Sequence, residues 1–270
     1  MDSRYRNFRY ILILIVNIKI LIYINLEGTF AAKKWKEMFP TAKICGETKT
    51  TTRHDELIKI GIEPRIRDDR SVNDESSAKH LLICIPPSAA AFYDEEINES
   101  IRLWGGPIGG GKLVFTSSIG IYGESNGNTV TETFRTDSRS QRSTKLLAVE
   151  EAVKLRDGIN VRLAGLYTEQ RGPHTYWLKS GKTIEGSEDG IVNMLHYEDA
   201  AGSAIAAILN GKNGATYLAC DDDPITRKEI CDAALESGLF PSATMPTFES
   251  VTGARGKVCD GNNTLNTKFC

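Results

Sequence analysis

Residues 112–123 read KLVFTSSIGIYG, a short apolar run that ends in a threonine, two serines and a glycine-containing loop. A continuous run of large apolar residues, bounded by polar residues and glycine, is typical of a strand buried on both faces of a parallel sheet. Ser117 and Ser118 stand at the carboxyl end of this strand, where open α/β sheets bind their ligands. We therefore expect this stretch to mark both the sheet and the rim of a binding site.

The same pattern recurs along the chain, and helical patterns separate the apolar runs. Strands are predicted at 41–48, 63–68, 79–88, 111–118, 159–167 and 215–220, with a further short strand after 189. Helices are predicted at 28–38, 54–62, 95–106, 144–158 and 224–238, with an alanine-rich helix ending near 210. This alternation predicts an α/β fold with a mostly parallel sheet covered by helices on both faces.

The composition is that of an ordinary globular protein and excludes several classes. The chain has 270 residues, is 40% hydrophobic and 25% charged, and carries a formal net charge of −2, which gives no electrostatic footprint for nucleic acid. Its six cysteines are scattered and form no C-x-x-C pair, so neither a disulfide framework nor a metal site is expected. These features indicate a soluble protein of a reducing compartment, the cytoplasm or the plastid stroma.

The amino terminus is the unusual part of the chain. Residues 10–26 read YILILIVNIKILIYINL, an apolar stretch interrupted by Asn17, Lys19 and Asn25. Because a membrane-spanning helix needs about 20 apolar residues, a buried parallel strand extended by extra sequence is the better interpretation, and membrane insertion is the alternative. We interpret residues 1–25 as an aberrant segment containing a degraded first strand, as a misplaced exon boundary would produce.

Several motifs occur in a fixed order: KLVFTSSIGIYG, TKLLAVEEAV, VRLAGLY, RGPH and MLHYEDAAGSAIAAI. Together they resemble the extended short-chain dehydrogenase/reductase superfamily, in particular its atypical NAD(P)-binding, NAD-dependent epimerase/dehydratase-like branch. The resemblance covers residues 26–240 and leaves an irregular tail at 241–270. It implies a Rossmann-type doubly wound sheet with a small C-terminal substrate lobe mainly after residue 168. It also implies NADP or NAD as cofactor, and a small-molecule substrate that the sequence does not identify.

In this family the first strand ends in a glycine-rich turn, G-x-x-G-x-x-G, where the cofactor pyrophosphate meets a helix N-terminus. Only Gly28 matches, as the last glycine, and Ile24, Asn25 and Leu26 replace the open positions before it. Their Cβ atoms stand where the phosphates should approach. The turn therefore predicts weakened cofactor binding.

The resemblance assigns the other cofactor contacts to the following strands. Thr52 and Arg53 follow the second strand, where a basic residue favours the 2′-phosphate of NADP over NAD, although a solvated polar loop is the alternative. Asp68 would lie near the adenine, and Pro86 and Pro87 would line the dinucleotide cleft.

Reductases of this superfamily combine a serine, a tyrosine and a lysine, with the last two in Y-x-x-x-K spacing on one helix face. Ser118, with Ser117 beside it, matches the serine and Lys145 matches the lysine, which also holds the nicotinamide ribose in the family. Gln141 stands at the tyrosine position and has no proton to exchange near neutral pH. Tyr122 is the substitute candidate. The alternatives are capping serines and a solvated first-turn lysine.

Three functions remain open at this point. The chain is an oxidoreductase or sugar-nucleotide epimerase-like enzyme, a non-catalytic sensor or scaffold that uses the dinucleotide structurally, or a variant whose cofactor binding is defective. A homodimer through the helix at 144–158 fits the family, but packing of that helix on its own sheet explains its apolar stripe equally well.

Overall fold

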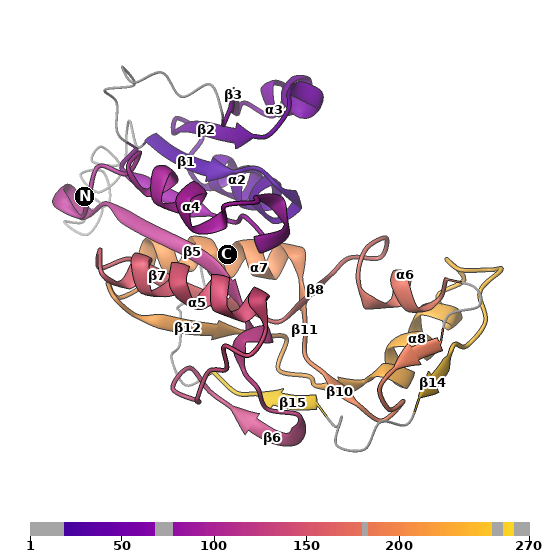
Figure 1. The fold of residues 1–270 in the computed structure, drawn as a ribbon. Coiled ribbons are helices and arrows are strands. Elements are labelled where there is room, and N and C mark those ends of the chain that lie inside the picture. The colour runs from indigo at the N-terminus through magenta and orange to yellow at the C-terminus, as the bar shows by residue number, and fades with distance from the viewer. Residues whose placement is uncertain (1–18, 68–77, 180–182, 250–255, 262–270) are drawn as a thin grey trace, which may run out of the picture.

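The computed structural model describes residues 19–67, 78–179, 183–249 and 256–261. Its centre is a sheet of seven parallel strands in the order β12–β7–β5–β4–β1–β2–β3 (Figure 1). The strands are β1 Lys19–Tyr23, β2 Lys43–Thr48, β3 Glu63–Ile66, β4 His80–Ile83, β5 Lys112–Ser118, β7 Ile159–Leu163 and β12 Thr216–Ala219. This is the Rossmann strand order, in which the chain turns back between its first and fourth strands, so the predicted doubly wound α/β fold is confirmed.

Strand β1, with the sequence KILIY, lies in the interior of the sheet, next to the middle strand β4. It is hydrogen-bonded to β2 on one side and to β4 on the other. Ile20 and Ile22 belong to the hydrophobic cluster on one face of the sheet, while Leu21 and Tyr23 belong to the cluster on the other. Because both faces are covered, every position of the strand except the first is buried and apolar, which explains its unbroken run of large residues.

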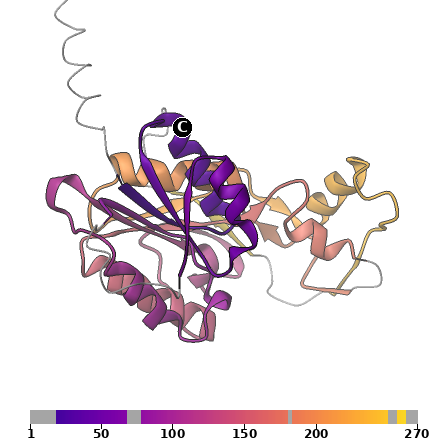
Figure 2. The ribbon, with the colours of Figure 1, turned by 90° about the horizontal axis from the view of Figure 1, so that it is seen from above.

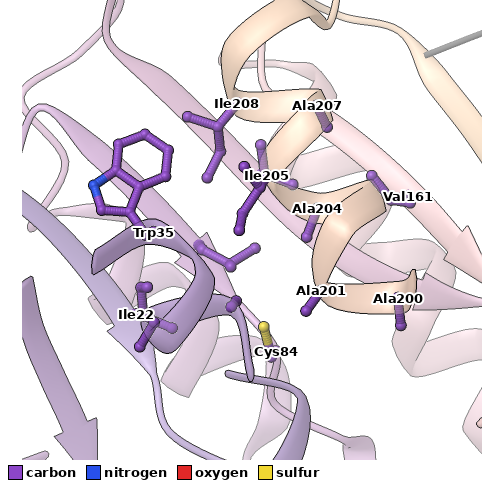
Figure 3. Close-up of a cluster of buried hydrophobic side chains, with 14 of the residues drawn as sticks. Ile22, Trp35, Cys84, Val161, Ala200, Ala201, Ala204, Ile205, Ala207 and Ile208 are labelled. Carbon is purple, nitrogen blue, oxygen red and sulfur yellow. The ribbon is translucent and has the colours of Figure 1, made fainter. Parts of the chain in front are cut away.

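One face of the sheet is covered by two helices, α2 Leu26–Met38 and α7 Tyr197–Asn210. Trp35 of α2 is fully buried and packs with the aliphatic side chains of α7, such as Ile205 and Ile208 (Figure 3). The alanine-rich surface of α7 lets this helix lie close to its neighbours, because small side chains permit a short distance between packed elements.

The opposite face is covered by α4 Tyr93–Ile101 and α5 Gln141–Lys154. Leu146, Val149 and Val153 of α5 join the same cluster as β4 and β5, so the apolar stripe of this helix is used within the chain. Figure 2 shows helices above and below the sheet and a separate group of elements to one side. At the edge of the sheet, the short helix α3 His54–Lys59 packs beside β3. The 3₁₀ turns of the described residues are η1 Thr51–Arg53, η2 Pro87–Ala89, η3 Ile108–Gly110 and η4 Ile119–Ile121.

The elements outside the main sheet form a lobe beside the carboxyl ends of its strands (Figures 1 and 2). A second sheet has the order β13–β10–β15–β6, and two further strand pairs are β8 with β11 and β9 with β14. The bounds are β6 Asn126–Val130, β8 Gly165–Tyr167, β9 Thr183–Glu185, β10 Ile191–Val192, β11 Met194–His196, β13 Ile225–Thr226, β14 Thr247–Glu249, β15 Gly256–Cys259, α6 Pro173–Trp177 and α8 Arg227–Glu236.

Two boundaries differ from those that the sequence predicts. The range 159–167 is split, because β7 stays in the main sheet and β8 leaves it to pair with β11. The tail after residue 241 is predicted to be irregular, yet β14 and β15 form there, and β15 inserts between β10 and β6. These short strands lack a hydrophobic pattern of their own and depend on pairing with distant residues.

The apolar segment at 10–26 is described only in part, since residues 10–18 lie outside the described ranges. Residues 19–23 are the interior strand β1, and α2 begins at Leu26. Within the described ranges, every helix is too short or too polar to cross a membrane.

Candidate functional site

A cleft of about 730 Å³ lies at the carboxyl ends of β1, β4, β5 and β7, between the main sheet and the lobe. The helices that follow β1 and β4, α2 and α4, cover opposite faces of the sheet, so the cleft includes the topological switch point of the fold. Residues from the main sheet that line it include Asn25–Glu27, Cys84–Pro87, Thr116–Gly120 and Leu163–Gly165. This cleft therefore lies at the rim of the sheet where a ligand site is expected.

The turn between β1 and α2 is very short, because only Ile24 and Asn25 separate the two elements. Asn25 is the N-cap of α2, and its Oδ1 atom accepts a hydrogen bond from the Gly28 amide at 2.7 Å. The Nδ2 atom of the same side chain donates to the carbonyl oxygen of Cys84, in the segment that follows β4. One asparagine side chain thus bridges the two strands on either side of the switch point.

Gly28 lies inside the first turn of α2 and does not line the cleft. A Cβ atom at this position would be only 2.0 Å from the Tyr23 carbonyl oxygen. The residue therefore permits close packing of the helix on the strand, which is the role of the last glycine in dinucleotide-binding turns.

Glu27 occupies the floor of the cleft and is only 3% exposed. Its Oε2 atom accepts a long hydrogen bond of 3.4 Å from the Thr116 hydroxyl, and among the described residues Oε1 has no partner. Burial raises the pKa of Glu27 to about 7, although hydrogen bonds from Thr116 and Cys84 act in the opposite direction. The sequence pattern singled out Gly28 and missed Glu27. The available signal was the presence of an acidic residue in the first turn of the predicted helix.

The two serines of β5 both line the cleft but have different environments. Ser118 is half-buried, and its Oγ atom accepts a hydrogen bond from the Gly120 amide at 3.1 Å, which caps the turn η4. Ser117 is 6% exposed, and its hydroxyl has no partner within the described ranges. The Ser117 hydroxyl is thus buried without a partner, whereas the Ser118 hydroxyl caps a turn.

The remaining catalytic candidates do not line the cleft. Gln141 is the first residue of α5 and is exposed; Lys145 is half-buried, and neither lines the cleft, whereas Arg142 does. Tyr122 is 2% exposed, and its hydroxyl accepts a hydrogen bond from Arg162 Nη1 at 2.8 Å. Burial raises the pKa of Tyr122.

The structure therefore argues against Tyr122 as the substitute acid. The turn η4 directs its side chain into the core, where it contacts Phe134 edge to face, instead of into the cleft. Of Ser118, Tyr122 and Lys145, only Ser118 lines the cleft.

Of the residues expected to contact the rest of the cofactor, only some line the cleft. Pro86 and Pro87 line the cleft after β4. Thr52 and Arg53 lie in η1, after β2, where the Arg53 guanidinium pairs with Glu56 at 2.9 Å and the Thr52 hydroxyl contacts that of Thr50 at 3.1 Å. Neither of them lines the cleft, and Asp68 lies outside the described residues.

An acidic residue does occur on β2, about 20 residues after Gly28, which is the usual distance to a ribose-binding carboxylate. This residue is Glu47, and the spacing could have identified it from the sequence. Its side chain is buried and forms an ion pair with Arg65 on β3, with Nη2 and Oε2 2.6 Å apart. The carboxylate therefore ties β2 to β3.

Four basic side chains line the cleft, and they come from four separate parts of the chain: Arg142, Arg171, Arg227 and Lys257. Glu27 and Glu124 are the acidic residues of the lining. Burial lowers the pKa of both Arg227 and Lys257. Two of these basic groups are held by neutral oxygens: Lys257 Nζ donates to the Tyr122 carbonyl at 2.7 Å, and Arg227 Nη1 donates to the Ser187 carbonyl at 3.0 Å. The excess of positive charge favours an anionic ligand.

No family model matches this chain. Protein YeeZ of Escherichia coli (strain K12) is 31% identical over 160 residues, which cover 57% of this chain and 56% of that protein. The chain thus matches little more than half the length of this curated relative.

Solved structures match almost the whole chain at low sequence identity. A functionally unknown conserved protein from Silicibacter pomeroyi DSS superposes with a TM-score of 0.70 and 19% identity over 94% of this chain and 92% of its own. UDP-glucuronic acid 4-epimerase from Bacillus cereus, in complex with NAD, has a TM-score of 0.70 and 12% identity over 93% and 96% of the two chains. These likenesses establish the fold, so the resemblance to epimerase/dehydratase-like proteins is confirmed at the level of the Rossmann-type architecture.

Proposed function

We propose that this chain is an NAD(P)-binding protein of the short-chain dehydrogenase/reductase type, with a cleft that also takes an anionic small molecule. The observation that carries the proposal is the position of the cleft, which crosses the carboxyl ends of β1, β4 and β5 at the switch point. The NAD bound in the Bacillus cereus epimerase supports the choice of cofactor.

Most of the cleft fits a dinucleotide. Gly28 allows the first helix to lie against the first strand, and Pro86 and Pro87 form a wall beside the switch point. The unpartnered Ser117 hydroxyl supplies a hydrogen-bond donor for a sugar or carboxamide group. The side chains of Asn25 and Glu27 fit a dinucleotide less well. Asn25 caps α2 and Glu27 lies in its first turn, where the pyrophosphate is bound in this fold.

A nicotinamide cofactor would supply hydride transfer, and the chain's own residues determine what accompanies it. Ser117 and Ser118 would orient a substrate oxygen at the end of β5. The positions expected from the family do not supply a proton-transferring tyrosine at the cleft, since Gln141 is exposed and Tyr122 is in the core. These two placements favour a second candidate function, a non-catalytic sensor that binds the dinucleotide without turnover.

The lobe side of the cleft supports an anionic substrate. Arg171, Arg227 and Lys257 approach from the lobe, and the excess of basic over acidic lining residues would stabilise a phosphate or carboxylate group. By analogy with the Bacillus cereus epimerase, we propose a sugar nucleotide or a comparable phosphorylated metabolite.

The test is a titration of the protein with NADPH and with NADH at pH 6, followed by cofactor fluorescence. We expect one dinucleotide per chain, and we expect the Ser117→Ala variant to bind about tenfold more weakly, the effect of one lost hydrogen bond in a buried site. Arg102→Ala, which changes an exposed residue that directly follows α4 and does not line the cleft, is the control and should bind normally. The proposal fails if the folded protein binds neither cofactor at millimolar concentration.

The two cofactors also test the assignment of Arg53. If its guanidinium contacts a 2′-phosphate, Arg53→Ala should weaken NADPH binding and leave NADH binding unchanged, although Glu56 competes for the same group. Turnover of sugar nucleotides or carbonyl compounds, measured only after binding is established, would then separate an enzyme from a sensor.

A further inference from the structure

The position of Glu27 conflicts with the charge of the ligand that the fold is built to hold. A dinucleotide pyrophosphate binds at the N-terminus of the first helix, where free amide groups and the helix dipole favour negative charge. Glu27 lies in the first turn of this helix, and its carboxyl group is buried in the floor of the same cleft. An ionised carboxylate there would repel the pyrophosphate in a region of low dielectric constant.

The groups packed around Glu27 do not neutralise it. Thr116 on β5 offers a hydroxyl, and the Cys84 thiol after β4 remains protonated because burial holds its pKa well above its ordinary value. Tyr197 on α7 faces the same carboxyl group and is itself hydrogen-bonded to Arg171. Among the described residues no salt bridge to Glu27 is formed. Its pKa of about 7 follows from this burial without a partner cation.

We propose that Glu27 selects the charge of the ligand in this cleft: an anionic dinucleotide binds only when the Glu27 carboxyl group holds a proton, so that each binding event above neutral pH takes up one proton. The protonated carboxyl group gains an O–H donor and no longer repels the phosphates. This inference rests on the proposed cofactor site and specifies the residue that controls its affinity.

Isothermal titration calorimetry with NADH tests the proposal, because the 2′-phosphate of NADPH would itself titrate near pH 6. Titrations at pH 6 and pH 8, each in two buffers of different ionisation enthalpy, give the affinity and the number of protons exchanged. For the wild-type protein we expect about tenfold weaker binding at pH 8 and an uptake of nearly one proton, as a group with a pKa near 7 requires. Glu27→Gln should bind equally at both pH values without proton uptake.

Glu37→Gln is the matched control, since it removes an exposed glutamate from the same helix and should behave like the wild type. Thermal unfolding shows whether each variant is folded, and Glu27→Leu provides a second neutral side chain if the glutamine variant is not. NADH binding by Glu27→Gln but not by the wild type at pH 8 also supports the proposal.

The two proposals fail in different ways. Wild-type affinity that is equal at pH 6 and pH 8, without proton uptake, overturns the role of Glu27 and leaves the cofactor site intact. If neither the wild type nor the folded Glu27 variants bind NADH at either pH, the cofactor site itself is overturned.

Discussion

The carbonyl oxygen of Tyr23 lies where a side chain on Gly28 would begin: a Cβ atom there would be 2.0 Å away. This contact joins the last residue of β1 to the first turn of α2 across a connection of two residues. The helix can therefore lie on its strand as dinucleotide-binding folds require, even though Asn25 occupies the turn before it.

Substituting Gly28 with alanine should destabilise the protein strongly. The added methyl group must displace backbone atoms of β1, so we expect a loss of about 2–3 kcal/mol in the free energy of unfolding, as for an overpacked core. Urea denaturation followed by circular dichroism measures this value. Gly120→Ala is the comparison, because its new Cβ atom would meet only the Ser118 hydroxyl at 3.3 Å, and an equal loss in both variants would contradict the proposed contact.

The neighbouring serines of β5 should respond to substitution in opposite ways. Ser118→Ala removes the cap of η4 and should cost about 1 kcal/mol of stability. Ser117→Ala removes a buried hydroxyl without a partner in the described structure, so stability should be unchanged or slightly higher. Chemical denaturation of the two variants without ligand makes the comparison, and a larger loss for Ser117→Ala would show that its hydroxyl has a structural partner.

Glu27 should make the protein less stable as the pH rises. Its pKa is raised from an ordinary value of 4.5 to about 7, so between these values the folded protein holds a proton that the unfolded chain releases. The stabilisation that this proton gives is complete below pH 4.5 and is lost as the pH rises through 7. The free energy of unfolding therefore falls by about 3 kcal/mol. Glu27→Gln should remove this dependence and be more stable than the wild type at pH 8.

The measurement is the free energy of unfolding of both proteins at pH 5 and pH 8. His80 also titrates, because burial lowers its pKa to about 4, and its contribution is lost as the pH falls from 6.5. The difference between wild type and variant cancels this effect, and Glu37→Gln controls for the loss of a glutamate. An equal pH dependence in all three proteins would contradict the unpaired burial of Glu27.

The ion pair between Arg162 on β7 and Glu150 on α5 should be strongly coupled. The two side chains are 8% and 7% exposed, with Nη2 and Oε2 2.7 Å apart. Arg162→Met leaves a buried carboxylate and should cost about 3–5 kcal/mol, whereas the double variant with Glu150→Leu should lose less than the sum of the single changes. Lys228 and Asp232 form an exposed pair whose removal should cost less than 1 kcal/mol, so similar coupling energies for both pairs would contradict this difference.

The extent to which the sequence specifies this protein differs between the sheet and the site. The unbroken apolar runs, such as KLVF before Ser117, predict buried parallel strands because only residues covered on both faces of a sheet are apolar without alternation. The carboxyl-end rule then places the ligand near Ser117, Pro86 and the first helix, and the cleft lies there.

The sequence could not decide which side chains face that cleft. Ser118 and Tyr122 are four residues apart, yet the turn η4 leaves the first at the rim and buries the second against Arg162. The lobe cations Arg227 and Lys257 are far from Ser117 along the chain and reach the cleft through strand pairing and helix packing. Glu27 has no sequence signal of its burial at all.

By itself, then, the sequence determined the order of strands and helices and the edge of the sheet where the cleft lies, because local apolar periodicity encodes burial within each element. The tertiary structure alone decided that the Ser117 hydroxyl is buried without a partner among the described residues, that Tyr122 is in the core, and that the buried carboxyl group of Glu27 is part of the cleft lining. Those outcomes depend on contacts between residues distant in sequence, and the protonation of Glu27 depends on a solvent exclusion that exists only once the sheet, α2 and α7 have packed together.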